Sequence, residues 1–166
     1  MLERFFPDAI ADSVYDIDFA KLYAAGYRGL LFDIDNTLVP HGAPADARII
    51  RFFDKIQDIG FSCCMISNNK KDRVKSFCDA VNQPYIEDAH KPSPKGYMRA
   101  MEQTKTACGN TVFVGDQLFT DIYGAKRAGI RTILVRPIHP KEEIQIVLKR
   151  YLERIVLYFY RKQGGG

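Results

Sequence analysis

Short apolar runs alternate along this chain with segments in which apolar residues recur at every third or fourth position. The apolar runs occupy residues 30–32, 61–66, 84–86, 111–114 and 131–135. The segments with helical spacing occupy residues 45–59, 70–81, 95–104 and 119–128. Continuously apolar strands that alternate with helices are typical of a parallel sheet covered on both faces. We therefore predict an α/β, three-layer sandwich with a five-stranded, mainly parallel sheet and helices on both faces.

The first apolar run leads directly into Asp33 and Asp35, two aspartates separated by a single residue. Side chains alternate between the faces of a strand, so these carboxylates would point the same way if the chain stayed extended. One carboxylate could hold Mg²⁺ and attack phosphorus, while the other could give a proton to the leaving oxygen and then take one from water. Paired aspartates also cap helices and fill turns, so the pair by itself is weak support for catalysis.

The segment before this motif repeats the same spacing at Asp16 and Asp18. No apolar strand precedes that second pair, and we predict that Asp18 caps a short helix over residues 19–25. The same segment contains Phe5 and Phe6, which could face a membrane or a partner protein. We favour the interpretation that these two rings cover an edge of the core.

Polar residues also mark the ends of the later strands. Ser67 follows the second strand, Lys91 precedes the third helix, and Asp116 and Asp121 follow the fourth strand. The carboxyl ends of parallel strands lie along one edge of a sheet, so these residues would meet the first aspartates around one small ligand. Carboxylates suit Mg²⁺, a serine hydroxyl and backbone N–H groups bind phosphate oxygens, and a lysine offsets the charge of a phosphoryl transition state.

In this order the four motifs resemble those of the haloacid dehalogenase (HAD) superfamily of aspartate-nucleophile phosphatases. The matching segments are Asp-Ile-Asp-Asn-Thr-Leu at 33–38, Ile-Ser-Asn-Asn at 66–69, Lys-Pro at 91–92 and Gly-Asp at 115–116, followed by Asp121. The resemblance covers residues 28–136, and it implies a Rossmann-like fold of the HAD type without a cap domain, a phosphatase activity and Mg²⁺ as the cofactor. The second aspartate favours phosphoryl transfer, because dehalogenases need no acid at that position.

Carried to this sequence, the resemblance implies two catalytic aspartates and a metal site. Asp33 would form the aspartyl-phosphate, and Asp35 would be the general acid and base. Mg²⁺ would contact Asp33, the main-chain carbonyl of Asp35 and Asp116. Asp121 would act through water or orient Lys91 rather than bind the metal directly.

The same resemblance implies that Thr37, Ser67 and the backbone at Asn68 hold the phosphate oxygens, together with Lys91. Lys95 also lies near the position expected for the lysine. The lysine of the family precedes a proline, so Lys91 is favoured and Lys95 is interpreted as a charge on a helix surface.

No lid domain fits between the motifs. Only 28 residues separate Leu38 from Ser67, and 23 separate Ser67 from Lys91. One helix and one strand use nearly all of each interval. An open site lets bulk water compete with small substrates, so such an enzyme is expected to act on large or surface-bound phosphates or to borrow a lid from another subunit.

Residues 141–162 have apolar side chains at three- and four-residue steps and are predicted to form an amphipathic helix. The helix also carries positive charges, at Lys149, Arg150, Arg154, Arg161 and Lys162. A basic, aromatic-rich amphipathic helix is typical of proteins at membrane surfaces. Packing on the chain's own sheet and a contact in a homodimer are the alternatives.

Within the superfamily, four features together resemble the lidless (subclass III) YqeG-like branch: Pro7 in the lead-in, the stretch Asp16-Ile17-Asp18, Asp-Asn-Thr-Leu-Val at 35–39 and Lys-Pro at 91–92. That branch is similar to mitochondrial phosphatidylglycerophosphate phosphatases. The resemblance implies a Mg²⁺-dependent phosphatase, and its substrate hypothesis is a lipid headgroup phosphate, that of phosphatidylglycerophosphate. One alternative is a phosphatase of a soluble phosphorylated metabolite, nucleotide or phosphoprotein. A non-catalytic phosphate-binding scaffold is the other, and it is disfavoured because no motif residue is missing.

Length, charge and cysteine content bear on the number of domains, the kind of partner and the location of the protein, but they do not indicate a further function. The 166 residues suit one domain over 1–166, with a core at 28–136, a lead-in at 1–27 and the C-terminal helix. A net charge of +4 does not indicate a nucleic-acid partner. Four cysteines without Cys-x-x-Cys spacing favour reduced, buried thiols over zinc ligands or disulfides. Because we find no signal sequence and no apolar run of about 18 residues, we expect a cytoplasmic protein, or one peripheral to the inner face of the membrane.

Overall fold

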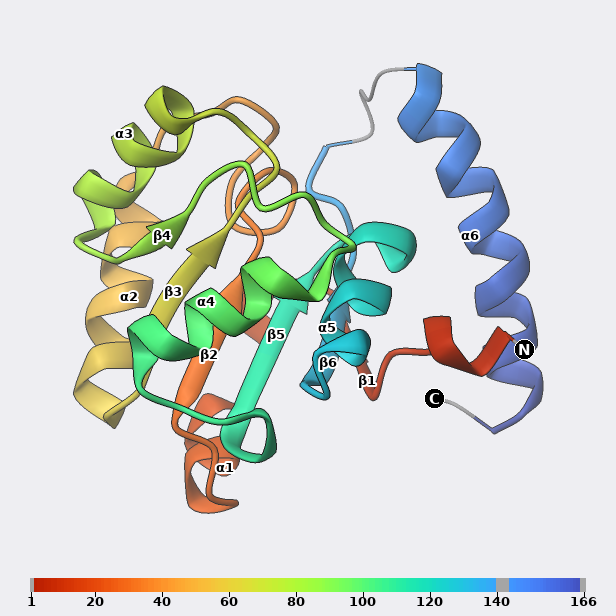
Figure 1. Cartoon of the computed structure of the whole chain (residues 1–166), viewed down its shortest axis with the longest axis horizontal. Coiled ribbons are helices and arrows are strands. Elements are labelled where there is room, and N and C mark those ends of the chain that lie inside the picture. Colours follow the sequence, from red (N-terminus) through yellow and green to blue (C-terminus); the bar gives the residue numbers. More distant parts are fainter. Residues whose placement is uncertain (1, 140–143, 165–166) are drawn as a thin grey trace.

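The computed structural model describes residues 2–139 and 144–164. At its centre lies a six-stranded sheet with the order β1-β6-β5-β2-β3-β4, in which all neighbouring strands are parallel (Figure 1). The strands are β1 (Ala9–Ala11), β2 (Gly29–Phe32), β3 (Ser62–Ile66), β4 (Tyr85–Ile86), β5 (Thr111–Gly115) and β6 (Arg131–Val135). All five predicted strands are present. The predicted number of strands was wrong because β1 is a half-exposed edge strand of three residues that pairs with β6 alone and carries only one large apolar side chain.

Helices cover both faces of the sheet, which confirms the predicted three-layer α/β fold (Figure 1). On one face lie α1 (Phe19–Ala24), α2 (Ala47–Ile59) and α3 (Lys71–Val81), and on the other lie α4 (Pro94–Thr104) and α5 (Tyr123–Arg127). α6 (Ile144–Lys162) lies beside the β6–β1 edge. The short helical turns are η1 (Leu2–Phe5), η2 (Val14–Asp16), η3 (Cys108–Asn110) and η4 (Leu118–Ile122). Within the described residues no cap domain is inserted between the motifs.

Consecutive residues of the central strands point to opposite faces of the sheet. Leu30 and Phe32 pack among the helices α1 to α3, whereas Leu31 packs against α4 and α5. Since both faces are covered, each of these three side chains is fully buried, and the strand is apolar at every position. The predicted cap of the first helix is also confirmed, because the Asp18 carboxylate accepts a hydrogen bond from the Lys21 N–H.

The helix predicted over residues 119–128 divides into the π-helical turn η4 and the helix α5. The hydroxyl of Tyr97 lies 3.0 Å from the carbonyl oxygen of Thr120 and 3.1 Å from that of Asp121, and donates to them from outside the helix. Because these two carbonyls accept from Tyr97, they do not need a hydrogen bond from an N–H group one helical turn further on. The widened turn also directs the Asp121 side chain toward the strand ends, and π turns are frequent at functional sites.

One side of α6 packs on the chain's own fold. Val156 and Tyr160 are buried, and the Tyr160 ring meets the ring of Phe6 edge to face at 5.3 Å. Phe5 packs against the same cluster, so the prediction that the two phenylalanines cover an edge of the core is confirmed. Residues 141–143 of the predicted C-terminal helix lie outside the described residues. In the described part, no helix is both long and apolar enough to cross a membrane.

The four cysteines do not share one environment. Cys63, Cys64 and Cys78 are buried, and this burial raises the pKa of each thiol. The prediction of buried thiols is wrong for Cys108, which is exposed because it lies in the surface turn η3.

Candidate active site

The candidate site lies where the strand order of the sheet reverses. From β2 the chain continues to β3 and β4 on one side, and later to β5 and β6 on the other. Open α/β sheets bind ligands at such a point, outside the carboxyl ends of the strands. Asp33 follows β2 and Asp116 follows β5, so the first and fourth motifs leave neighbouring strands. Ser67 reaches the same edge from β3, and Lys91 from the loop before α4.

A tight turn after β2 brings Thr37 back toward the aspartates. The Thr37 N–H donates to the carbonyl of Ile34, and Asn36 has a φ of 64°, in the left-handed region that asparagine adopts more readily than most residues. The buried hydroxyl of Thr37 lies 3.2 Å from Asp116 Oδ1 and 3.4 Å from Asp33 Oδ2. Thr37 therefore links the first motif to the fourth.

Lys91 is the centre of the buried polar network. Its Nζ lies 2.6 Å from Asp33 Oδ1 and 2.6 Å from Asp121 Oδ1, and its side chain is only 4% exposed. The other carboxylate oxygen of Asp121 accepts hydrogen bonds from the N–H groups of Asp116 and Gln117, each at 3.1 Å. Burial would lower the pKa of Lys91, but Asp121 and Asp33 outweigh it and hold the pKa above its ordinary value. Lys91 is therefore positively charged at neutral pH.

The second motif supports this lysine. The side-chain amide of Asn68 accepts from the Lys91 N–H at 2.7 Å and donates to the Lys91 carbonyl at 3.2 Å. The neighbouring Ser67 hydroxyl accepts from the Asn69 N–H at 3.0 Å. Lys95 is exposed and does not line the site. These two hydrogen bonds of the Asn68 side chain were not predicted from the sequence, which suggested only a backbone role for this residue.

Asp35 points toward α3 rather than toward Lys91. Its carboxylate accepts hydrogen bonds from Asn69 Nδ2 at 2.5 Å, from the Gly42 N–H at 2.7 Å and from Arg73 at 2.9 Å. Sequence reasoning did not identify Asn69 or Arg73. Arg73 lies one turn into a helix whose period shows only its apolar face, so no local signal distinguishes it from a surface arginine.

Three buried carboxylates at this edge fit a cation. Asp33, Asp116 and Asp121 each offer an oxygen, and these oxygens lie within 4.8 Å of one another. Burial, opposed by Lys91, raises the pKa of Asp33 from 3.8 to about 7. Burial and the neighbouring Asp121 and Asp33 raise the pKa of Asp116 well above its ordinary value, although Arg150 opposes this. Hard divalent cations prefer such oxygen ligands and would relieve the mutual repulsion.

The carboxylates of this cluster differ in how free they are to bind a metal. Both oxygens of Asp121 already accept from the Lys91 ammonium and from two main-chain N–H groups. Asp33 accepts from Lys91 with one oxygen only, and its other oxygen lies near the Thr37 hydroxyl. Asp33 is therefore better placed than Asp121 to hold a cation, whereas Asp116 accepts from the Thr37 hydroxyl and pairs with Arg150.

A cavity of about 170 Å³ opens above these groups. Among the residues predicted for the site, those that line it are Asp33, Asp35, Ser67, Asn68 and Lys91. Residues to which the sequence assigned no role in the site complete the lining: Asn36, His41, Asn69, Gln117, Thr120 and Lys149. Pockets for drug-sized ligands measure about 300–1,000 Å³, so this cavity suits a group as small as a phosphate rather than a whole substrate.

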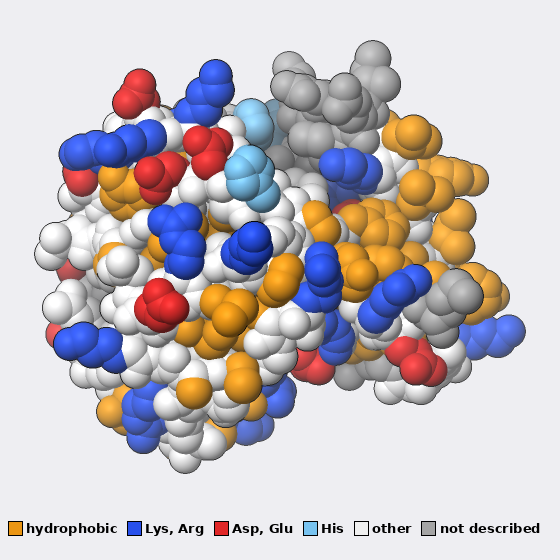
Figure 2. Space-filling view, viewed as in Figure 1, with side chains coloured by type: hydrophobic (Ala, Val, Ile, Leu, Met, Phe, Trp, Pro, Cys, Tyr) orange, Lys and Arg blue, Asp and Glu red, His pale blue; other side chains and the backbone are white. Residues whose placement is uncertain are grey.

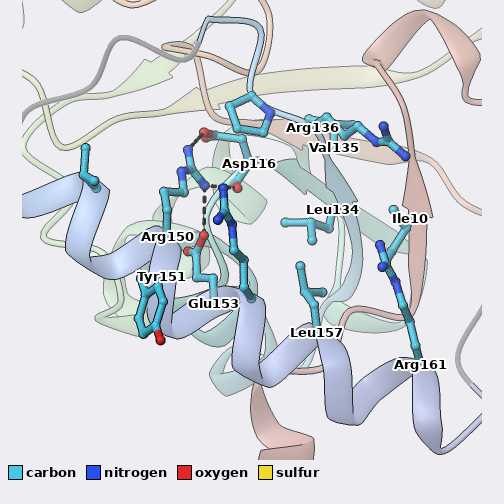
Figure 3. Close-up of a pocket in the computed structure, with 13 residues that line it drawn as sticks. Ile10, Asp116, Leu134, Val135, Arg136, Arg150, Tyr151, Glu153, Leu157 and Arg161 are labelled. Atoms are coloured by element: carbon cyan, nitrogen blue, oxygen red, sulfur yellow. Dashed lines mark hydrogen bonds and ion pairs between the residues drawn. The ribbon is translucent and has the colours of Figure 1, made fainter.

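The C-terminal helix α6 also reaches the site, which the sequence did not predict (Figure 3). Arg150 donates to the main-chain oxygen of Asp116 at 2.5 Å, pairs with the Asp116 carboxylate, and lies 3.1 Å from Glu153 Oε2. The buried Glu153 accepts from the Leu118 N–H at 2.7 Å. The sequence placed Arg150 among the surface charges of the helix, because only the packed structure shows which side of α6 faces the sheet.

The arrangement can support nucleophilic substitution at phosphorus. A carboxylate at a strand end, a buried lysine beside it and a small polar cavity are the groups that such a reaction needs. The motif residues that follow separate strands meet at this edge. Asp35 also lines the cavity, although its carboxylate accepts from Asn69 and Arg73.

Comparison with known protein sequences identifies relatives over nearly the whole chain. A family model described as HAD-hydrolase-like matches residues 89–143. The "Probable phosphatase YqeG" of Bacillus subtilis is 34% identical over 166 residues, which cover 99% of this chain and 96% of that protein. The chloroplastic phosphatidylglycerophosphate phosphatase 1 of Chlamydomonas reinhardtii is 25% identical over 158 residues, which cover 89% of this chain and 59% of that protein.

Solved structures share the fold at low sequence identity. A HAD family hydrolase from Deinococcus radiodurans, with bound phosphate and sodium, has a TM-score of 0.58 and 15% identity, and the match covers 76% of this chain and 88% of that one. The cobalt-bound deoxy-D-mannose-octulosonate 8-phosphate phosphatase from Haemophilus influenzae has a TM-score of 0.53 and 11% identity, with 66% and 68% covered. At these identities the likeness is one of fold.

Proposed function

Because this chain belongs to the HAD-like hydrolase family and is a phosphatase similar to YqeG, we propose that it hydrolyses phosphate monoesters with Mg²⁺, through a phosphate bound covalently to Asp33. One observation carries this proposal. The buried ammonium of Lys91 lies 2.6 Å from both Asp33 and Asp121, beside Asp116, at the switch point of the sheet. It can both orient the nucleophile and offset the charge of a phosphoryl group.

In the first step, a carboxylate oxygen of Asp33 attacks phosphorus. A bond from Asp33 to phosphorus forms, and the bond from phosphorus to the leaving oxygen of the substrate breaks. Lys91, the Ser67 hydroxyl and the backbone at Asn68 stabilise the charge on the phosphoryl oxygens. Asp35 gives a proton to the leaving oxygen, so the product departs as an alcohol.

In the second step, Asp35 takes a proton from a water molecule whose oxygen attacks phosphorus. The bond between Asp33 and phosphorus breaks, and inorganic phosphate leaves. The Asp35 carboxylate faces Asn69 and Arg73 in this structure. Catalytic hydrogen bonds often tighten only in the complex with substrate, and Asp35 then exchanges one of these contacts for the leaving oxygen.

Asp33, Asp116 and the main-chain carbonyl of Asp35 would hold the Mg²⁺ ion, and Thr37 would orient Asp116. When bound, the ion would offset the negative charge of the phosphoryl group and of the carboxylates around it. Asp121 instead holds Lys91 in place, because its oxygens are already occupied by hydrogen bonds.

The proposed substrate is a lipid headgroup phosphate, that of phosphatidylglycerophosphate, at a membrane surface. Three observations support it. The described residues contain no inserted cap, α6 exposes a row of apolar side chains, and a relative from Chlamydomonas reinhardtii is named as a phosphatase of this lipid. In this proposal residues 1–166 act as one domain, with α6 bordering the site in place of a cap.

Hydrolysis of a generic aryl phosphate tests the chemistry. Wild-type protein should release phosphate in the presence of Mg²⁺ and stop when the ion is chelated, and Asp33→Asn should be inactive. Asp58→Asn, an exposed aspartate on α2, is the matched control and should keep full activity. Activity that survives in Asp33→Asn contradicts the covalent route, and a wild type without hydrolysis supports a scaffold.

Mixed micelles of phosphatidylglycerophosphate then test the substrate. We expect the wild type to release phosphate from the lipid more efficiently than from soluble phosphorylated sugars and nucleotides. The reverse preference would indicate a phosphatase of soluble metabolites and would remove the lipid from the proposal.

A further inference from the structure

A groove of about 470 Å³ lies beside the catalytic cavity, between α6 and the edge of the sheet formed by β6 and β1 (Figure 3). Its apolar walls come from both sides, and their residues are Ile10, Leu134, Val135, Val147 and Leu157. Ligand pockets of about 300–1,000 Å³ are typically apolar with a few polar groups, and this groove has that size and character. It is large enough for the apolar part of a ligand that the catalytic cavity is too small to hold.

Positive charge lines the same groove. The charged side chains are those of Arg136, Arg150, Arg154 and Arg161, and Figure 3 shows Arg150 at one end, beside Asp116, and Arg161 toward the other. Arg154 and Arg161 are exposed, and neither has an acidic partner in the ranges that the structure describes. A guanidinium pairs well with a phosphate group, so apolar walls with unpaired arginines suit an anionic amphiphile.

The groove lies next to the catalytic cavity, although the two share no lining residue. Asp116 and Arg150 line the groove, while Lys149, the preceding residue of α6, lines the catalytic cavity. A molecule whose terminal phosphate lies in the small cavity can therefore pass along α6 at these residues and place its remainder in the groove. The cavity would thus hold the polar end of one substrate, and the groove would hold its apolar end.

The outer side of α6 favours a membrane as the source of this molecule. Its exposed apolar residues include Leu148, Tyr151, Leu152, Ile155, Tyr158 and Phe159, and the first two are 65% and 63% exposed. Figure 2 shows hydrophobic side chains gathered along this helix, with lysine and arginine side chains near them. An apolar helix side flanked by basic residues lies well in the headgroup region of a bilayer. The mouth of the groove opens beside the same helix.

We propose that this groove binds an acyl chain of the phospholipid substrate, while Arg154 pairs with the internal phosphodiester of the lipid. This inference rests on the proposed lipid phosphatase function and adds the surface that would select an acylated substrate. α6 then has two roles, because its inner side forms the lipid site and its outer side lies against the bilayer.

The test compares two substrates that differ only in their acyl chains. Dioleoyl phosphatidylglycerophosphate in mixed micelles is one, and its deacylated headgroup in solution is the other. Leu157→Trp should fill the groove, and Arg154→Glu should repel the phosphodiester. Leu157→Trp should lower the ratio of kcat/KM for the lipid to kcat/KM for the headgroup by about tenfold, the effect of excluding roughly two methylene groups from apolar surface. Both substrates contain the phosphodiester, so Arg154→Glu should instead lower kcat/KM for both of them relative to kcat/KM for an aryl phosphate, which lacks it. Arg154→Glu alters an exposed side chain, so it remains informative if Leu157→Trp does not fold.

Met98→Trp and Arg99→Glu on the exposed side of α4 are the matched controls, and they should leave both the lipid-to-headgroup ratio and the activity relative to the aryl phosphate unchanged. If the wild type cleaves the lipid, Leu157→Trp keeps the lipid-to-headgroup ratio and Arg154→Glu keeps the activity on both substrates relative to the aryl phosphate, the groove is not the acyl site, although the lipid phosphatase proposal survives. If the wild type cleaves only the headgroup, both proposals fail. If the groove variants convert a wild-type dimer into a monomer in sedimentation, the groove binds a second copy of the chain, and the acyl proposal is overturned.

Discussion

Replacing the proposed nucleophile should make the metal-free protein more stable at alkaline pH. Asp33, Asp116 and Asp121 share two cationic partners, Lys91 and Arg150, so the buried cluster has an excess of negative charge. Asp33→Asn removes one of these charges but keeps a carbonyl oxygen that can still accept from Lys91. Lys91 also keeps its contact with Asp121, so no buried cation is left without a partner.

The size of the effect follows from the pKa of Asp33. Burial raises this pKa from 3.8 to about 7, a difference of about 3 pKa units, which corresponds to about 4 kcal/mol. A carboxyl whose pKa is higher in the folded state favours folding below pH 3.8 and loses that contribution as the pH rises toward 7. In chelator at pH 8, Asp33→Asn should therefore raise the free energy of unfolding by up to about 4 kcal/mol, or Tm by about 8–16 °C. At pH 4 the two proteins should have similar stability.

Thermal unfolding followed by circular dichroism, from pH 4 to pH 8 with and without Mg²⁺, measures this difference. Mg²⁺ should stabilise the wild type more than the variant, because it relieves the same repulsion. Asp58→Asn, an exposed aspartate, should show no pH-dependent gain. An Asp33→Asn protein that is no more stable than wild type at pH 8, or equally stabilised at every pH, would refute the charge argument.

Three other substitutions test separate parts of the site. Lys91→Ala should lower kcat on an aryl phosphate by about 10²–10³-fold. Substitution of the exposed Lys95 by Ala should change kcat by no more than about twofold. The opposite pattern would show that Lys95, and not Lys91, is the lysine of the site. Gly115→Ala would place a Cβ 2.6 Å from a carboxylate oxygen of Asp121, so chemical denaturation should show a loss of about 1–3 kcal/mol; an unchanged midpoint would mean that the loop adjusts. Glu153→Ala leaves a main-chain N–H of η4 without its acceptor and should cost about 1–3 kcal/mol, while Glu153→Gln should recover part of the loss. Equal stability of these two variants would contradict that role.

Local patterns in the sequence were sufficient for most of the architecture. The sheet is buried on both faces, so strands such as β2 and β5 are continuously apolar, and amphipathic periods mark the helices between them. Parallel strands end at one edge, which makes the meeting of Asp33, Ser67, Lys91 and Asp116 predictable from their order alone. The short strand β1 was missed because Ala9–Ala11 is a half-exposed edge segment with only one large apolar side chain.

Contacts between distant segments could not be predicted in this way. The π turn η4 depends on the hydroxyl of Tyr97, which reaches it from another helix, and the orientation of Asp35 depends on Arg73 from α3. The approach of Arg150 to Asp116 depends on how α6 is rotated against the sheet.

The sequence by itself therefore determined the fold class, the family and the candidate catalytic residues, because each of these depends on local pattern and on strand order. Only the tertiary structure decided that α6 borders the site, that Arg150 pairs with Asp116 and that an apolar groove lies beside the cavity. A helical period shows that one side of α6 is apolar, but the free energy of packing the whole molecule decides which side of the helix faces the core and which neighbours each side chain finds.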